Sequence, residues 1–258
     1  MIGRPLVLQI DMGDGLARKS LAEQVYELLE RAVVQGQIPP GTRLSEEAIG
    51  AAFAVSRSPA REAIAELELK GLAERLPNRE RRVTVPSEIF IRDTYGVWIL
   101  LESERLFMAS TVAEPELVAS LEEQVDRIEA LTPRGSAAEI SAAVTAFHTD
   151  LQRGCPNKQL HRITGDWNLY IRWLRRLYFD YDAEATERGI SDHRSIVECF
   201  KQRSRPKLFK AMRKHVEWQR DLVLEGWRKS NAAWLVETGG MLEFRLTGRA
   251  DIPVGPLG

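Results

Sequence analysis

The sequence predicts a mainly α-helical fold, with one small β-hairpin in an N-terminal unit and an all-helical bundle in a C-terminal unit. Apolar residues recur at helical spacing through nearly all of the chain. Proline and glycine interrupt this pattern at intervals typical of helix lengths, and a single stretch near residue 80 looks like two short paired strands. The length of 258 residues accommodates two domains of ordinary size.

The N-terminal unit is expected to contain three helices and then the hairpin. Gly36 closes the first helix, and Ser45, followed by two glutamates, is a typical N-cap for the second. Pro59 suits the first turn of the third helix, which Gly71 ends. The predicted helices span residues 19–35, 45–53 and 58–70, and the hairpin spans residues 76–85 with its turn at Pro77-Asn78.

Long amphipathic helices fill the rest of the chain after a boundary at Pro86. Six are expected, over residues 88–112, 115–131, 136–153, 157–181, 185–203 and 205–229, and the family resemblance described below implies six or seven helices in this bundle. The predicted organisation is an arm over residues 1–18, a first domain over 19–86, a helical domain over 87–229 and a tail over 230–258.

Composition excludes several classes of protein. The 36 basic and 37 acidic residues give a net charge of −1, so the chain does not bind nucleic acid by bulk charge, although a local basic surface stays possible. Two cysteines are too few for a disulfide scaffold. No apolar run is long enough to span a membrane, and residues 1–10 do not resemble a secretory signal. A cytoplasmic protein with no membrane partner is expected.

Helix, short helix, turn, helix and hairpin follow one another in the order of a winged helix-turn-helix. In such units the second helix of the pair enters the major groove of DNA. Arginine suits bidentate contact with guanine or phosphate, although arginines on one helix face are also compatible with a solvated, salt-bridged surface. The expected DNA-contacting residues are Ser56, Arg57, Ser58 and Arg61 at the start of the third helix, and Arg79, Arg81 and Arg82 on the wing.

Contiguous motifs in this unit support DNA binding. Residues 36–46 resemble the G-x-x-x-P-G-x-x-L-x-E opening of the GntR family of bacterial transcription regulators. Residues 55–64 resemble the family's V-S-R-[ST]-P-x-R-E-A-[LI] recognition segment, and residues 67–72 continue it as L-x-x-x-G-L. The resemblance implies that Ser56, Arg57, Ser58 and Arg61 lie at the DNA.

The N-terminal unit departs from the family pattern at three places. Glu47 stands where the family often has arginine, and an acid facing phosphate must turn away or meet a different operator. Ala54 replaces the usual glycine before Val-Ser. Pro77-Asn78-Arg79 replaces a glycine-rich wing tip, where asparagine tolerates the left-handed conformation.

The chain has only four histidines, so their positions are informative about the chemistry of the C-terminal unit. Phe147-His148 followed by Asn157 resembles the D-x-x-F-H…N segment of the FCD (FadR C-terminal) domain of GntR regulators, and His193 with His215 resembles its H-x-x-I…H pattern. The resemblance implies a helical bundle with a central cavity that in many members holds a divalent metal and a small carboxylate effector. His161 lies outside the pattern and is expected to be structural.

Three imidazoles from three helices suit a divalent metal such as zinc or nickel and leave coordination positions open. We therefore predict His148, His193 and His215 as metal ligands, with one metal per chain. The family's aspartate, four residues before the motif histidine, is Val144 here, so the site lacks a carboxylate ligand. Asp150 is expected to face elsewhere.

The expected effector pocket contains Trp98, Glu102 and Arg172. Residues 98–102 align with the family's R-x-x-L-E segment, so Trp98 replaces an arginine that often meets the effector carboxylate. Trp98 is equally compatible with ordinary core packing. Arg172, on an aromatic-rich helix, is a candidate to supply the missing positive charge.

The function that follows is a metabolite-responsive transcription regulator, expected to repress and not to be an enzyme. It acts as a homodimer on a pseudo-palindromic DNA operator, with a small carboxylate as effector. Two alternatives stay open: a metal-dependent hydrolase that carries a winged helix, and a ligand-independent structural DNA-binding dimer. No general base is placed beside the histidine motifs, which speaks against the hydrolase.

Overall fold

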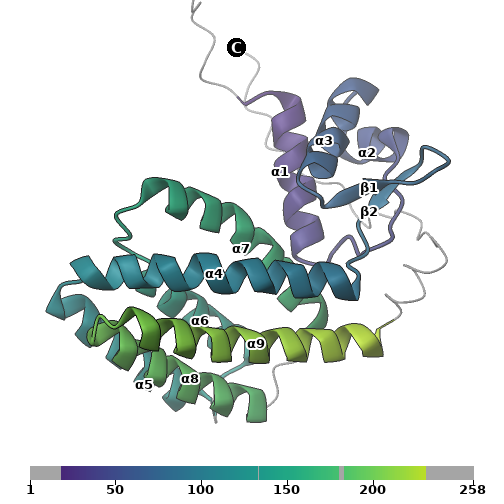
Figure 1. The fold of residues 1–258 in the computed structure, drawn as a ribbon. Coiled ribbons are helices and arrows are strands. Elements are labelled where there is room, and N and C mark those ends of the chain that lie inside the picture. Colours follow the sequence, from purple (N-terminus) through teal and green to yellow (C-terminus); the bar gives the residue numbers. More distant parts are fainter. Residues whose placement is uncertain (1–18, 133, 180–182, 231–258) are drawn as a thin grey trace, which may run out of the picture.

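The computed structural model describes residues 19–132, 134–179 and 183–230. The predicted arm, and all of the predicted tail beyond Ser230, lie outside these residues. Within them the chain is mainly α-helical with one two-stranded antiparallel sheet, so the predicted fold class is confirmed (Figure 1).

The N-terminal unit forms as a helix, a helix-turn-helix and a wing. Ser20 begins α1 with a full capping box, and the hydroxyl of Ser45 accepts the Ala48 N–H at the start of α2. The recognition helix begins one residue earlier than predicted, because Ser56 already has the extended backbone of an N-cap. The helices are α1 (Leu21–Val34), α2 (Glu46–Phe53) and α3 (Arg57–Leu69).

The hairpin is shifted from its predicted position. Strand β1 (Ala73–Arg75) pairs with β2 (Arg81–Val83), and Leu76, expected to precede the turn as a strand residue, already closes the turn through its N–H to the Glu80 carbonyl. The left-handed residue is Arg79, at φ 68°, and not Asn78 as expected. The Asn78 side chain instead accepts the Glu80 N–H at 3.1 Å, which fixes the tip without a glycine.

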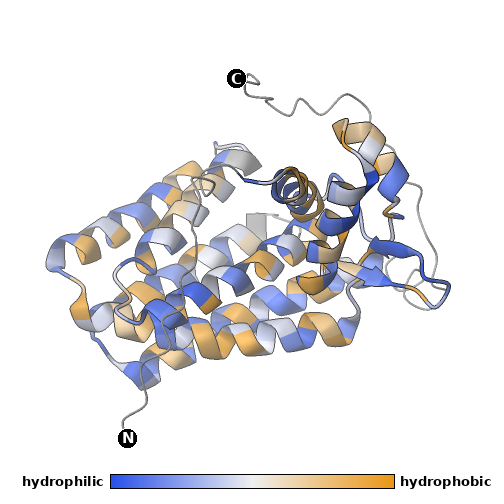
Figure 2. Cartoon of the chain, turned by 90° about the horizontal axis from the view of Figure 1, so that it is seen from above, coloured by the Kyte–Doolittle hydropathy of each residue, from blue (hydrophilic) through white to orange (hydrophobic). Residues whose placement is uncertain are grey.

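The C-terminal unit is a bundle of six helices in the described residues. The two longest, α4 and α9, run side by side (Figure 1), and the apolar stripes of the helices turn toward a common core (Figure 2). The helices are α4 (Glu88–Val112), α5 (Pro115–Leu131), α6 (Ala137–Leu151), α7 (Lys158–Tyr178), α8 (Ala183–Lys201) and α9 (Arg205–Lys229). Helix α7 ends three residues before its predicted end. Helix α8 begins and ends two residues before its predicted bounds.

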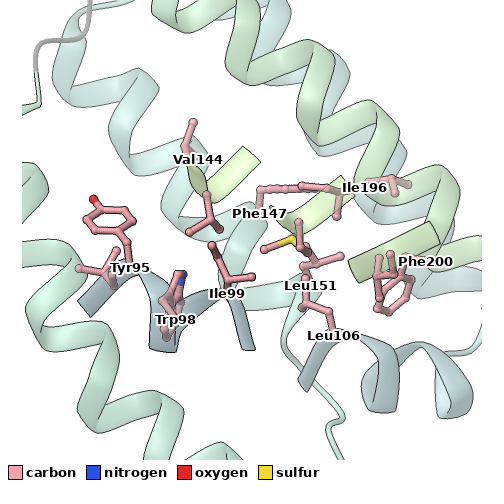
Figure 3. Packing of buried hydrophobic residues seen from close by; sticks show 14 of the residues in the cluster. Tyr95, Trp98, Ile99, Leu106, Val144, Phe147, Leu151, Ile196 and Phe200 are labelled. Atoms are coloured by element: carbon pink, nitrogen blue, oxygen red, sulfur yellow. The ribbon is translucent and has the colours of Figure 1, made fainter. Parts of the chain in front are cut away.

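The bundle core joins α4 and α6 closely. Trp98 and Leu106 from α4 lie with Phe147 and Leu151 from α6 in one buried cluster, which Ile196 and Phe200 of α8 extend (Figure 3). Among the described residues, none of the helices combines the length and apolar composition that a membrane crossing needs.

Helix α7 belongs to both units. Its Trp173 is fully buried within the apolar core of the N-terminal unit, whereas Ile171 and Leu174 lie in the core of the bundle. The Tyr170 hydroxyl donates to the carbonyl of Lys70, the C-cap of α3, at 2.6 Å. Arg176 Nε donates to the carbonyl of Gln35, the C-cap of α1, at 3.1 Å. One bundle helix therefore holds the C-terminal ends of two helices of the N-terminal unit.

Candidate functional site

The start of α3 presents the four predicted recognition residues to solvent. Ser56, Arg57, Ser58 and Arg61 are all exposed. The Ser56 side chain makes no capping hydrogen bond, so its hydroxyl can face outward. Arg57 and Arg61 are separated by one helical turn and lie on one face of α3.

Glu47 of α2 forms an ion pair with Arg57, with 3.4 Å between Oε2 and Nη2. Both side chains are more than two-thirds exposed, so the pair is worth at most about 1 kcal/mol in water. Glu47 therefore competes weakly with a DNA phosphate or base for the Arg57 guanidinium.

The structure separates the three wing arginines. Arg79 is exposed at the tip of the hairpin. Arg81 forms ion pairs with Glu46 and Glu68, and the buried Arg82 forms a 2.8 Å ion pair with Glu74. Arg81 therefore holds the wing to α2 and α3, Arg82 joins the two strands of the wing, and Arg79 is the wing arginine that faces outward.

The alanine that replaces the family's glycine lies between α2 and α3 and has a left-handed backbone conformation. Ala54 has φ 54°, a conformation that glycine adopts without steric cost. The alanine therefore carries backbone strain of about 1 kcal/mol where the family uses glycine.

Three histidines from three helices meet inside the bundle. His148 lies on α6, His193 on α8 and His215 on α9, and one ligand nitrogen of each lies within 4.8 Å of the others. The ring centroid of His193 lies 5.0 Å from the ring centroid of His148 and 5.0 Å from that of His215. His161, in contrast, is exposed on α7 and outside this cluster.

Burial keeps these histidines neutral. It lowers the pKa values of His148 and His193 well below the usual value, and the other imidazoles lower them further. Neutral imidazole has a lone pair for a metal ion. Nε2 of His148 and both ring nitrogens of His193 are buried without a hydrogen-bond partner among the described residues. Orphaned buried nitrogens that converge in this way fit a divalent metal.

A buried carboxylate lies behind His215. Asp192 Oδ2 is 3.6 Å from His215 Nδ1, and Lys214 Nζ contacts the other carboxylate oxygen at 3.0 Å. Burial alone raises the pKa of Asp192, but the interactions with His215 and Lys214 outweigh it and lower that pKa to about 2. The ionised Asp192 favours a proton on Nδ1, so Nε2 would be the ligand atom of His215. In the structure Nε2 lies 2.8 Å from Nε2 of Gln219 and accepts a hydrogen bond from that amide, which a metal ion would replace.

One cavity of about 90 Å³ brings the predicted effector residues beside this cluster. Trp98, Glu102 and Arg172 all line it, together with His148 and His215. A smaller cavity of about 30 Å³ on the other side of His215 is lined by His193 and Trp218. Val144, which packs within the buried apolar cluster (Figure 3), lines both cavities, so an apolar side chain occupies the wall where the family has its aspartate. Asp150 faces elsewhere and accepts a hydrogen bond from Gln124 at 3.0 Å.

Glu102 is the acidic group of the larger cavity. Burial raises its pKa to about 7, against the opposing effect of Arg105, whose Nε lies 3.2 Å from its carboxylate. Gln152 of α6 donates a 2.6 Å hydrogen bond to the other oxygen. Glu102 therefore links α4 to α6 at the cavity wall.

Sequence reasoning missed three residues that the structure places at or beside these sites. Asp192 directly precedes a predicted ligand, but no motif marks it. Gln219 lines the cavity, as does Arg175, which flanks the same aromatic stripe as the candidate Arg172. Trp173 was not distinguished from the surrounding apolar residues of its helix. Glu74 lies opposite Arg82 in the neighbouring strand, but the predicted hairpin began at residue 76 and did not include it.

Comparison with known proteins agrees with this arrangement. The family model described as "Bacterial regulatory proteins, gntR family" matches residues 21–83, and the FCD domain model matches residues 93–217. The HTH-type transcriptional regulator YdhC of Bacillus subtilis (strain 168) is 28% identical over 194 residues, which are 75% of this chain and 84% of that protein.

A second relative and a solved structure extend the comparison. The gluconate operon transcriptional repressor of B. subtilis (strain 168) is 29% identical over 226 residues, covering 82% of this chain and 88% of that protein. The solved structure of E. coli McbR/YncC superposes with a TM-score of 0.62 at 17% identity, covering 81% of this chain and 100% of that one, which supports the fold. The chain is a transcription regulator of the GntR family with an FCD domain, and it is not an enzyme.

Proposed function

We propose that this regulator represses transcription and that a small carboxylate, bound with a divalent metal in the histidine cavity, controls its affinity for DNA. The observation that carries the proposal is that all three predicted effector residues line the same cavity as His148 and His215. The similarity to a gluconate operon repressor supports repression as the direction of control.

His148, His193 and His215 would hold the metal. Three neutral imidazoles suit zinc or nickel and leave positions for water or a ligand oxygen. When bound, the metal supplies a positive charge that attracts a carboxylate. Because Val144 replaces the family's aspartate, no acidic ligand of the protein reduces this charge, and the site favours an anionic effector.

Helix α7 offers a direct route from the cavity to the DNA-binding unit. Arg172 and Arg175 line the cavity, and the intervening Trp173 is buried in the core of the DNA-binding unit. Tyr170 contacts the C-cap of the recognition helix. An effector that binds one pose of α7 more tightly than another can change DNA affinity by at most that difference in binding free energy.

The DNA surface consists of Ser56, Arg57, Ser58 and Arg61 on α3 with Arg79 on the wing. Replacing Arg57 with alanine is expected to weaken specific binding by about 1–3 kcal/mol, because a base-reading arginine contributes this much discrimination. The measurement is a titration of duplexes selected from a random pool, at fixed salt. Arg127→Ala, an exposed arginine of α5, is the control and should bind as the wild type does. Unchanged affinity and sequence preference in Arg57→Ala would contradict the assignment of the recognition helix.

A homodimer would bring two recognition helices to a pseudo-palindromic operator. Helix α4 has a suitable face, because Ile89 and Leu100 are 71% and 59% exposed and Gly96 lies between them with open space above it. Residues 89, 93, 96 and 100 follow the spacing of one helix stripe.

Replacing Leu100 with glutamate is expected to convert the dimer to a monomer, because it removes one of the two large exposed apolar side chains of this stripe and adds a second negative charge to that of Asp93. Analytical ultracentrifugation reports the mass. Ile163→Glu changes another exposed apolar residue, on α7, and should leave the dimer intact. A Leu100→Glu protein that stays dimeric would place the interface elsewhere.

A further inference from the structure

We propose that the groove between α1 of the DNA-binding unit and helices α6 and α7 of the bundle binds the distal anionic group of an elongated, dianionic effector. This inference rests on the proposed function, because it takes one carboxylate of the effector to lie in the histidine cavity. It adds a second site, outside that cavity, and names the effector class as a molecule with an acidic group at each end.

The groove is large and adjoins the cavity. Its volume is about 960 Å³, and it lies between the two units, with residues of α1 on one side and of α6 and α7 on the other. Thr145, Arg172 and Arg175 line both the groove and the 90 Å³ cavity. The proposed effector would be held at His148 and His215 and would pass these three side chains to reach the groove.

Arginines give the groove its charge. Arg31 of α1 and Arg172, Arg175 and Arg176 of α7 all line it. No ion pair or hydrogen bond joins the side chain of Arg31 or Arg172 to another residue in the part of the chain that the structure describes. Two exposed guanidinium groups on opposite walls suit a carboxylate or phosphate, which each can bind through two N–H groups.

Two acids also line the groove, and neither forms an ion pair with Arg31 or Arg172 among the described residues. Glu27 forms a 2.6 Å ion pair with Lys19, just before α1, and Glu30 accepts a hydrogen bond from the Tyr26 hydroxyl. Arg176 contacts the Gln35 carbonyl and so stays at the junction of α1 and α7. An anion between Arg31 and Arg172 would join the DNA-binding unit to the bundle.

The geometry also indicates what each end of the effector does. The proximal acid lies against residues of the bundle, whereas the distal acid contacts both units through Arg31 and Arg172. The distal acid is therefore expected to affect the relative pose of the two units, and a monoacid of the same length is expected to bind without changing affinity for DNA.

The test compares two series of acids on the full-length protein loaded with zinc. Succinate, glutarate, adipate and pimelate are titrated calorimetrically beside the monoacids butyrate to heptanoate of equal carbon number. At least one longer diacid is expected to bind about tenfold more tightly than its monoacid, a difference of about 1.4 kcal/mol. Arg31→Gln is expected to remove this advantage and to leave monoacid binding unchanged. Arg162→Gln, an exposed arginine of α7 outside the groove, is expected to keep it.

The outcomes separate the two proposals. Equal affinity for diacids and monoacids, or a diacid advantage that survives Arg31→Gln, would overturn the groove site and leave the cavity site standing. Binding of none of the acids would overturn both. Loss of monoacid binding in Arg31→Gln would show that Arg31 supports the fold, and Arg31→Lys, which keeps the charge, would then have to restore the diacid advantage for the groove site to stand.

Discussion

Elemental analysis of the chain, purified without a histidine tag, is expected to find about one divalent metal ion per chain, and the His193→Ala variant is expected to contain none. His193 is the central member of the cluster, with both ring nitrogens buried and without hydrogen-bond partners among the described residues. Removing it leaves two ligands, which hold zinc or nickel far more weakly than three. The measurement is inductively coupled plasma mass spectrometry on both proteins.

The fourth histidine provides a matched control. His161 is exposed and lies outside the cluster, so His161→Ala is expected to retain the metal. Metal at about a thousandfold above its dissociation constant stabilises the folded state by about 4 kcal/mol, so a chelator should lower the melting temperature of the wild type and of His161→Ala but not of His193→Ala. A wild type that takes up neither Zn²⁺ nor Ni²⁺ would show that Val144 disables the site. The effector search would then turn to aromatic or acyl ligands beside Trp98.

Replacing Trp173 with alanine is expected to lower the free energy of unfolding by about 3–5 kcal/mol, the usual cost of emptying a fully buried aromatic site. The indole is completely buried and joins the bundle to the core of the DNA-binding unit. Phe90 packs against it edge to face, with ring centroids 6.4 Å apart. Urea denaturation followed by circular dichroism measures the loss.

Trp173→Phe separates packing from hydrogen bonding at this position. The indole Nε1 has no hydrogen-bond partner among the described residues, so phenylalanine removes no bond and keeps an aromatic ring in the site. It is expected to retain most of the stability and to respond to effector as the wild type does. An alanine variant that loses less than about 1 kcal/mol would show that Trp173 does not join the two units.

Local signals in the sequence predicted much of the fold. The caps at Ser45 and the breaks at Gly36 and Gly71 are properties of neighbouring residues, and the structure has the expected helix ends there. The turn at Pro77-Asn78 was predicted in the right place, but the first strand was not, because Ala73–Arg75 directly follows Gly71-Leu72 and has no apolar alternation that marks it as a strand. The exposed residues at the start of the recognition helix were predictable for the same reason as the caps, because neighbouring residues determine where a helix begins.

The roles of the arginines were not predictable in this way. Arg79, Arg81 and Arg82 look alike in the sequence, yet Arg82 is buried against Glu74 and Arg79 is exposed. Which of them faces outward depends on strand register and on acids from α2 and α3. Arg172 was expected to contact the effector. The structure places it between the cavity and the groove, which α1 of the DNA-binding unit also lines.

Four features could be predicted from the sequence because they depend on local spacing or on contiguous motifs. They are the family, the order of the helices, the recognition motif and the three histidines as a set. The tertiary structure alone decided that Asp192 lies behind His215, that Val144 forms the cavity wall, and that α7 carries Trp173 into the other unit. These are contacts between residues far apart in the chain. They depend on how helices rotate and pack against one another, and no local pattern encodes that rotation.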